Sequence, residues 1–128
     1  MKHRTIFAYL FTGLVGSTTQ AIPTIQNWET TNGAQVYFVP APEIPMVDVE
    51  INFDAGSARD ADQPGVAMLT NGLLNEGAGK LSADQIAEQF DNLGAQLGLS
   101  VGRDSASVSL RSLSDPKPLQ TALDLLTI

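Results

Sequence analysis

A short, almost uncharged stretch, Gly65–Gly77, constrains the fold of this chain more than any other feature. Pro64 precedes it and favours the start of a helix, while the glycine at its end and Gly79 favour termination. Small and apolar residues cover almost the whole circumference in between, so we expect a short helix that is buried on all sides. Apart from Glu76 at its very end, the stretch carries no charge. Other elements of the chain must therefore enclose it.

Strand patterns flank this helix in the sequence. Met46–Phe53 alternates apolar and polar side chains, which predicts a strand with one buried face. Its polar side chains are better explained as a solvated face than as a set of ligands. Asn32-Gly33 separates two earlier strand-like runs and is a strong hairpin signal. The predicted strands span residues 28–31, 34–39, 46–53, 97–101 and 106–113.

Two further helices are predicted from their caps. Ser82 and Gln85 form a capping box at the start of the second helix, which ends near Gly94. Asp115 as N-cap and Pro116 in the first turn begin the third helix. The apolar residues expected to face the core are Ile86, Phe90 and Leu93 in the second helix and Leu119, Leu123 and Leu126 in the third.

The order of these elements, β-β-β-α-α-β-β-α, predicts an α+β fold. Helices would pack on one face of a mainly antiparallel sheet. The third helix reaches Ile128 without a capping residue. We therefore expect a truncated domain of a larger multidomain protein.

The first 21 residues have the features of a secretory signal peptide. A basic start is followed by the apolar run Ile6–Val15, which is too short to span a bilayer, and by small polar residues. We predict cleavage after Ala21, with a site after Ser17 as the weaker option; a buried amphipathic N-terminal segment is the other interpretation. The mature domain would comprise residues 22–128 and would be periplasmic or secreted.

Composition excludes several classes of function. The chain has no cysteine, and its one histidine, His3, lies in the predicted signal peptide. The only charged zinc ligands left in the mature segment are therefore carboxylates, which by themselves rarely form a zinc site. Loss of Lys2 and Arg4 would change the formal charge from −7 to −9. So acidic a domain is not expected to bind nucleic acid or anionic lipid.

Four groups of residues hint at chemistry, but turns and surface contacts explain them better. A phosphate-binding loop at Gly77, Gly79 and Lys80 would lack the Walker spacing and the preceding strand. Ser57 has no histidine to activate it. An Arg59–Asp60 ion pair would add little stability at the surface. The nearby carboxylates lack the spacing of an EF-hand calcium loop; they are Asp54, Asp60 and Asp62.

Taken in order, the segments from about Trp28 to Ile128 resemble the N-terminal domain of the insulinase/pitrilysin family of zinc peptidases. Each segment by itself is a weak signal, and the ordered set is specific. The matching segments are the hairpin at 32–36, the strand at 47–53 with the turn at 55–60, the helix borders at 65–67 and 73–77, and the helix at 82–94 with its end at 93–95.

Active members of that family carry the motif His-x-x-Glu-His on the helix that corresponds to 65–77. The histidines bind zinc and the glutamate activates the metal-bound water. The resemblance places Met68 at the first histidine, Asn71 at the glutamate and Gly72 at the second histidine. None of these residues can do that chemistry, so we predict no catalytic, metal-binding or cofactor-binding residue in this segment. The third family ligand, a glutamate, would lie beyond Ile128.

The resemblance thus implies a non-catalytic, exported member of the family. Such a member would pair with an active zinc peptidase subunit and help it bind and enclose peptides. Its acidity would suit basic or unfolded peptides. Two alternatives stay open: a zinc metalloendopeptidase whose active motif lies in another part of the chain, and a scaffold protein without a peptidase partner. No nucleic acid and no stable membrane span are expected.

Overall fold

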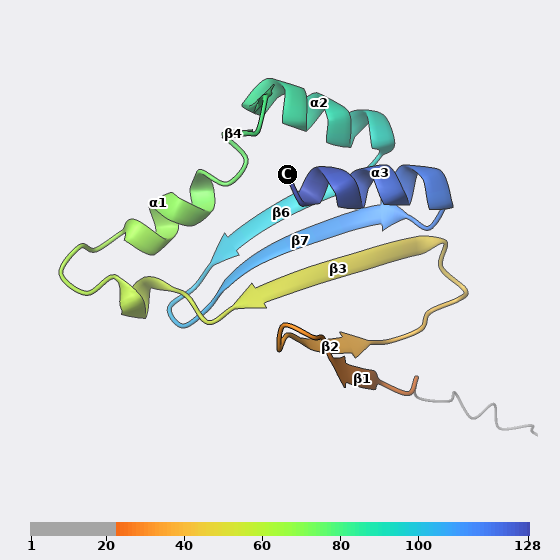
Figure 1. The fold of residues 1–128 in the computed structure, drawn as a ribbon, viewed down its shortest axis with the longest axis horizontal. Coiled ribbons are helices and arrows are strands. Elements are labelled where there is room, and N and C mark those ends of the chain that lie inside the picture. The colour runs from red at the N-terminus through yellow and green to blue at the C-terminus, as the bar shows by residue number, and fades with distance from the viewer. Residues whose placement is uncertain (1–22) are drawn as a thin grey trace, which may run out of the picture. The chain divides into compact units, whose positions relative to one another are not determined.

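The computed structural model describes residues 23–128, drawn as a ribbon in Figure 1. The chain divides into two compact units, Met1–Ala41 and Pro42–Ile128. The predicted signal peptide lies outside the described residues. Across residues 23–128, no helix has the length and apolar character that a membrane crossing requires.

The described part of the first unit is a hairpin of β1 (Gln26–Glu29) and β2 (Gln35–Phe38), which pair antiparallel. The predicted hairpin is confirmed, but its connection is wider than the Asn32-Gly33 pair. The Thr30 N–H donates to the Ala34 carbonyl oxygen, and the Ala34 N–H donates to Thr30 Oγ1, both at 2.9 Å. Because of these bonds, the strands stop pairing at Glu29 and Gln35, and the connection runs from Thr30 to Ala34 instead of being a two-residue turn.

The second unit is built on a three-stranded antiparallel sheet. Its strands are β3 (Met46–Phe53), β7 (Ala106–Leu113) and β6 (Gln96–Val101), in the order β3-β7-β6. All three strands were predicted from the sequence, and β6 begins one residue earlier than predicted. The register places Leu110 of β7 between Val49 of β3 and Leu97 of β6, so these three apolar side chains share one face of the sheet.

Helices α2 and α3 lie side by side over that apolar face (Figure 1). This arrangement confirms the predicted α+β class. The remaining elements of the unit include a small hairpin that the sequence did not predict. The helices and short strands are η1 (Ser57–Arg59), α1 (Val66–Gly72), β4 (Gly77–Ala78), β5 (Leu81–Ser82), α2 (Ala83–Leu93) and α3 (Pro116–Leu126).

Local signals fix the ends of α2 but only partly those of α3. The predicted capping box is confirmed: the Ser82 N–H donates to Gln85 Oε1 at 3.0 Å, and the Gln85 N–H donates to Ser82 Oγ at 3.3 Å. Gly94 ends the helix in the left-handed region, at φ +63°. Asp115 stands at the N-cap position of α3, but its side chain makes no capping bond, so that part of the prediction is wrong.

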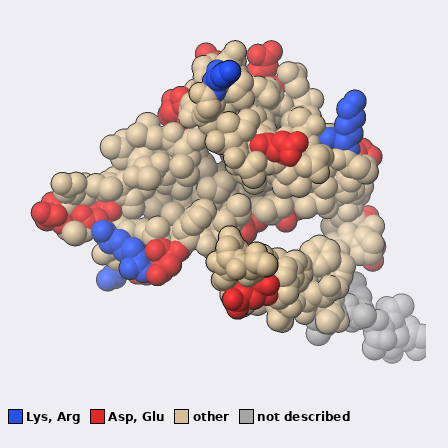
Figure 2. Space-filling view, viewed as in Figure 1, with Lys and Arg blue, Asp and Glu red and all other residues tan. Residues whose placement is uncertain are grey.

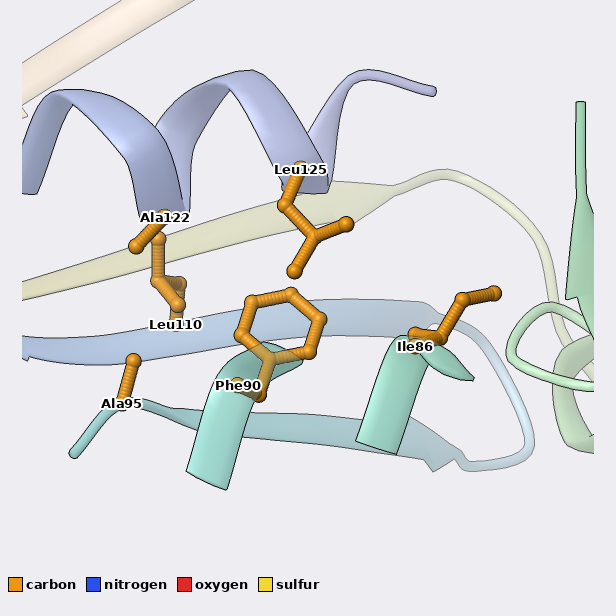
Figure 3. Packing of buried hydrophobic residues seen from close by; sticks show 6 residues of the cluster. All are labelled: Ile86, Phe90, Ala95, Leu110, Ala122 and Leu125. Atoms are coloured by element: carbon orange, nitrogen blue, oxygen red, sulfur yellow. The ribbon is translucent and has the colours of Figure 1, made fainter. Parts of the chain in front are cut away.

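The buried core joins the two helices to the sheet. On α3 the buried residues are Ala122 and Leu125, whereas the predicted residues Leu119, Leu123 and Leu126 are only half-buried. Ala122 and Leu125 are three residues apart and so lie on one side of α3, next to the predicted leucines, and this side faces the core. Figure 3 shows the cluster, which comprises Ile86, Phe90, Ala95, Leu110, Ala122 and Leu125.

Candidate functional site

The candidate site is α1, the helix that carries Met68, Asn71 and Gly72, the three positions that the resemblance assigns to the family's motif. An aspartate before the helix fixes its first turn: Asp60 Oδ2 accepts from the Gly65 N–H at 2.7 Å, and Asp60 Oδ1 accepts from the Ala67 N–H at 2.8 Å. Helix N–H groups that lack partners are satisfied by a carboxylate in this way. The sequence assigned Asp60 to a turn. Its capping role was missed because it lies five residues before Gly65, outside the usual capping spacing.

The predicted burial of this helix is wrong. Its one buried residue is Asn71, at 7% exposure, and Ala67 one turn earlier is half-buried. The large apolar side chains point away from the sheet, and Leu69 is 64% exposed. The helix also ends at Gly72, earlier than predicted. The side that faces β6 and η1 therefore consists of the small and amide side chains, and the opposite side is apolar and open.

The three motif positions lie on α1 with distinct surroundings. Met68 and Gly72 are one helical turn apart and so share a flank of the helix, whereas Asn71 lies toward the sheet. The Met68 thioether side chain is 69% exposed. A Cβ added to Gly72 would meet no atom within 4 Å. The flank thus has room for larger side chains at both of its positions, but the residues present bring no ionisable group to it.

The turn before α1 is held against the β6–β7 hairpin. The Ser57 N–H donates to the Gly102 carbonyl oxygen at 3.1 Å, and the Ala58 N–H donates to the Arg103 carbonyl oxygen at 2.8 Å. Gly56 lies directly on that hairpin, where an added Cβ would stand 2.5 Å from the Arg103 carbonyl oxygen. This contact positions the whole segment that leads into α1. Only the tertiary structure reveals it.

The carboxylates near the turn do not converge on a common point. The sequence suggested an ion pair between Arg59 and Asp60. In the structure Arg59 pairs with Asp54 instead. Asp60 is engaged by the backbone of α1. Within residues 23–128 there is no group of three or more His, Cys, Asp or Glu side chains placed to hold a metal ion. The turn thus gives no sign of a calcium site.

The glycines after α1 belong to the small β4–β5 hairpin. Gly77 begins β4, and Gly79 and Lys80 form the connection to β5. Gly79 adopts φ +59°, which suits a tight turn. A phosphate-binding loop would lead from a strand directly into a helix N-terminus, which this connection does not do.

The polar face of the sheet, opposite the helices, holds a shallow pocket of about 330 Å³. It lies over an ion pair: Arg111 Nε and Nη2 donate to the two carboxylate oxygens of Asp48 at 2.7 and 2.9 Å. Both side chains are exposed, as the predicted solvated face requires. The sequence could not identify the pair, because it depends on the register of β3 against β7.

The Arg111 hydrogen bonds hold the pKa of Asp48 below its ordinary value of 3.8, against an opposing effect of desolvation and with a further contribution from the positive charge of Arg111. The lowered pKa means that the ion pair stabilises the folded state when the pH is above the ordinary pKa of 3.8. The stabilisation is lost as the pH falls through the lower pKa of the folded state. At so exposed a site, solvent screening keeps the effect small.

Comparisons with known proteins give one consistent result. A model of the insulinase family (peptidase family M16) matches residues 36–127. The peptidase M16 inactive domain from Pseudomonas fluorescens is 46% identical, with a TM-score of 0.78, over 80% of this chain and 25% of that chain. A search of curated proteins found no match.

Two more distant solved structures are similar in fold. A protease from Helicobacter pylori is 20% identical with a TM-score of 0.70, over 81% of this chain and 25% of that chain. A protein described as an M16-like peptidase, from Alicyclobacillus acidocaldarius, is 16% identical with a TM-score of 0.65, over 87% of this chain and 28% of that chain. The present chain thus spans about a quarter of the length of these solved structures.

Proposed function

The chain belongs to the insulinase family of peptidases, and we propose that it is a non-catalytic, exported member that helps an active zinc peptidase subunit bind and enclose peptides. The family predicted from the sequence is confirmed by this match. The similarity to a domain described as inactive, at 46% identity, supports the non-catalytic role.

The observation that carries the proposal is the chemistry of Met68, Asn71 and Gly72 on α1. Zinc in a peptidase site needs imidazole or carboxylate ligands and an open position for water. A neutral thioether, an amide turned toward the sheet and a residue without a side chain supply none of these. The residues present therefore do not fit zinc at this helix, and no reaction step can be assigned to them.

Two further features support a role in holding peptides. Among the described strands β6 pairs only with β7, so its other edge has free backbone N–H and C=O groups. An extended peptide can add to such an edge through main-chain hydrogen bonds. Acidic side chains predominate over basic ones on the face drawn in Figure 2, and the formal charge of −7 favours basic peptides.

Export is proposed from the sequence of residues 1–21 alone. A basic start, an apolar core and a small-residue end are the three regions of a cleavable signal. Cleavage after Ala21 would leave a mature chain that begins at Ile22. N-terminal sequencing of the protein recovered outside the cytoplasm tests this directly; a chain that still begins at Met1 would contradict it.

The non-catalytic role predicts that the purified protein binds no stoichiometric zinc and cleaves no peptide by itself. The measurement is metal analysis by mass spectrometry after dialysis against zinc. Adding the protein to an active family member from the same cell should raise peptide cleavage above that member's own rate. One tightly bound zinc per chain would contradict the proposal.

A matched control is the double variant Met68→His, Gly72→His. Both positions are open, so the variant should fold, and it places two imidazoles one turn apart on one flank of α1. We expect zinc binding by calorimetry in this variant and not in the native protein. Recovery of the native protein alone, with no gain in cleavage on mixing, would favour the scaffold alternative. Zinc-dependent cleavage by a longer native chain would favour an active motif elsewhere.

A further inference from the structure

The pocket of about 330 Å³ on the polar face of the sheet lies between two rows of side chains. The register sets these rows, because it places residues of β3, β7 and β6 opposite one another. The first row is Asp48, Arg111 and Gln96, and the second row is Glu50, Ser109 and Gly98. The backbone between the rows forms the floor, since the side chains there point to the other face. We name this space the sheet pocket.

Gly98 keeps the sheet pocket open on its β6 side. A Cβ at this position would stand 2.4 Å from Ser109 Oγ, so a larger residue would fill the space beside that hydroxyl. The Ser109 hydroxyl donates to the Gly98 carbonyl oxygen at 3.5 Å. This distance is longer than the usual separation of about 2.5–3.0 Å between two hydrogen-bonded oxygens. The hydroxyl is therefore weakly held and can turn to accept a hydrogen bond from a ligand.

The charged residues that line the sheet pocket leave one negative charge without a partner. Asp48 is neutralised by Arg111, which donates to both of its carboxylate oxygens. Glu50 lies two residues further along β3 and is exposed. Within residues 23–128 the ion pairs are those of Arg59 with Asp54 and of Arg111 with Asp48, so no cation there pairs with Glu50. The complementary ligand is therefore a single positive charge.

We propose that the sheet pocket binds an arginine side chain of a peptide, with Glu50 as its counter-ion. The planar guanidinium donates two parallel hydrogen bonds to one carboxylate, which a lysine ammonium cannot do. Its remaining N–H groups can reach the Ser109 hydroxyl and the amide oxygen of Gln96. The floor suits the methylene groups, because its backbone polar groups are already bonded within the sheet. This inference rests on the proposed peptide-binding role and names the side chain that is held.

The test measures peptide binding by fluorescence anisotropy with the purified protein at its natural length. The probe is a fluorescein-labelled peptide that has a single arginine among alanine and serine residues. The matched probe carries citrulline in its place, which has the shape of arginine without the charge. The Glu50→Gln variant removes the proposed counter-ion. The Glu88→Gln variant is the matched control, because Glu88 is exposed on α2, which packs on the opposite face of the sheet.

We expect the native protein to bind the arginine peptide about fivefold more tightly than the citrulline peptide. Glu50→Gln should abolish this preference, and Glu88→Gln should keep it. Absence of binding, or a preference that persists in Glu50→Gln, overturns the proposal. An equal loss in Glu88→Gln also overturns it, because it indicates a general attraction to an acidic surface.

This experiment is separable from the test of the proposed function. Binding is measured without zinc, partner subunit or cleavage, whereas the proposed function is tested by the gain in cleavage on mixing. A gain in cleavage that Glu50→Gln leaves intact, together with an unchanged arginine preference, would overturn the pocket and leave the proposed function standing. An arginine preference that depends on Glu50, without any gain in cleavage, would support the pocket and contradict the proposed function.

Discussion

Replacing Phe90 with alanine is expected to lower the free energy of unfolding by about 3–5 kcal/mol. Phe90 is the largest side chain of the buried cluster and is only 5% exposed. Its ring extends from α2 toward Leu125 of α3 and lies beside Leu110 of the sheet (Figure 3). Its removal would leave a cavity where both helices and the sheet meet. Since small domains are stable by only about 5–15 kcal/mol, urea unfolding should detect the loss easily.

Ser112→Ala is the matched control for this prediction. Ser112 lies two residues after Leu110 on β7, is equally buried, and its hydroxyl has no hydrogen-bond partner. A buried hydroxyl without a partner is destabilising, so its removal should leave stability unchanged or raise it by about 1 kcal/mol. A loss of stability in Ser112→Ala comparable to that in Phe90→Ala would mean that the region does not pack as described.

Replacing Gly56 with alanine is expected to destabilise the fold by about 3 kcal/mol, although only one methyl group is added. That methyl would stand 2.5 Å from the Arg103 carbonyl oxygen and 2.8 Å from the Ser105 backbone nitrogen. Backbone atoms of a hairpin cannot rotate away as a side chain can. The turn that leads into α1 would have to separate from the hairpin, with loss of the Ser57 and Ala58 hydrogen bonds. Thermal unfolding measures the effect.

The control for Gly56→Ala is Gly98→Ala on β6. There the added methyl would meet the hydroxyl of Ser109, which can rotate to another staggered position. We expect a clearly smaller loss of stability, by about 1 kcal/mol. Equal losses in the two variants would show that the clash at Gly56 is relieved by movement of the hairpin.

The local elements could be predicted from the sequence because their signals lie within a few residues. The strand at Met46–Phe53 and the capping box at Ser82 and Gln85 depend on near neighbours, and both are confirmed. The predicted buried face of the strand is wrong at its far end, because Ile51 and Phe53 are exposed. The order of such elements also led to the family that the comparisons confirm. Partner, export and the loss of zinc chemistry at Met68, Asn71 and Gly72 stay predictions.

Contacts between distant segments could not be predicted in this way. The Asp48–Arg111 pair needs the register of two strands 63 positions apart, and the close approach at Gly56 needs a hairpin that forms almost fifty residues later. The capping of α1 by Asp60 depends on a turn whose path the spacing does not reveal. Each of these contacts forms only when segments that are distant in the sequence pack together in the folded chain.

Helix α1 shows most clearly what the local sequence determines and what only the tertiary structure decides. Its residues determine that a short apolar helix forms near Val66–Gly72, and that it lacks groups for metal chemistry. They do not determine which side is covered, because an almost uniformly apolar surface has no preferred face. The tertiary structure decided this by placing Ala67 and Asn71 on the inner side, toward β6 and η1, and leaving Val66, Leu69 and Leu73 exposed. Burial is a property of what packs against a helix, and those neighbours lie elsewhere in the chain.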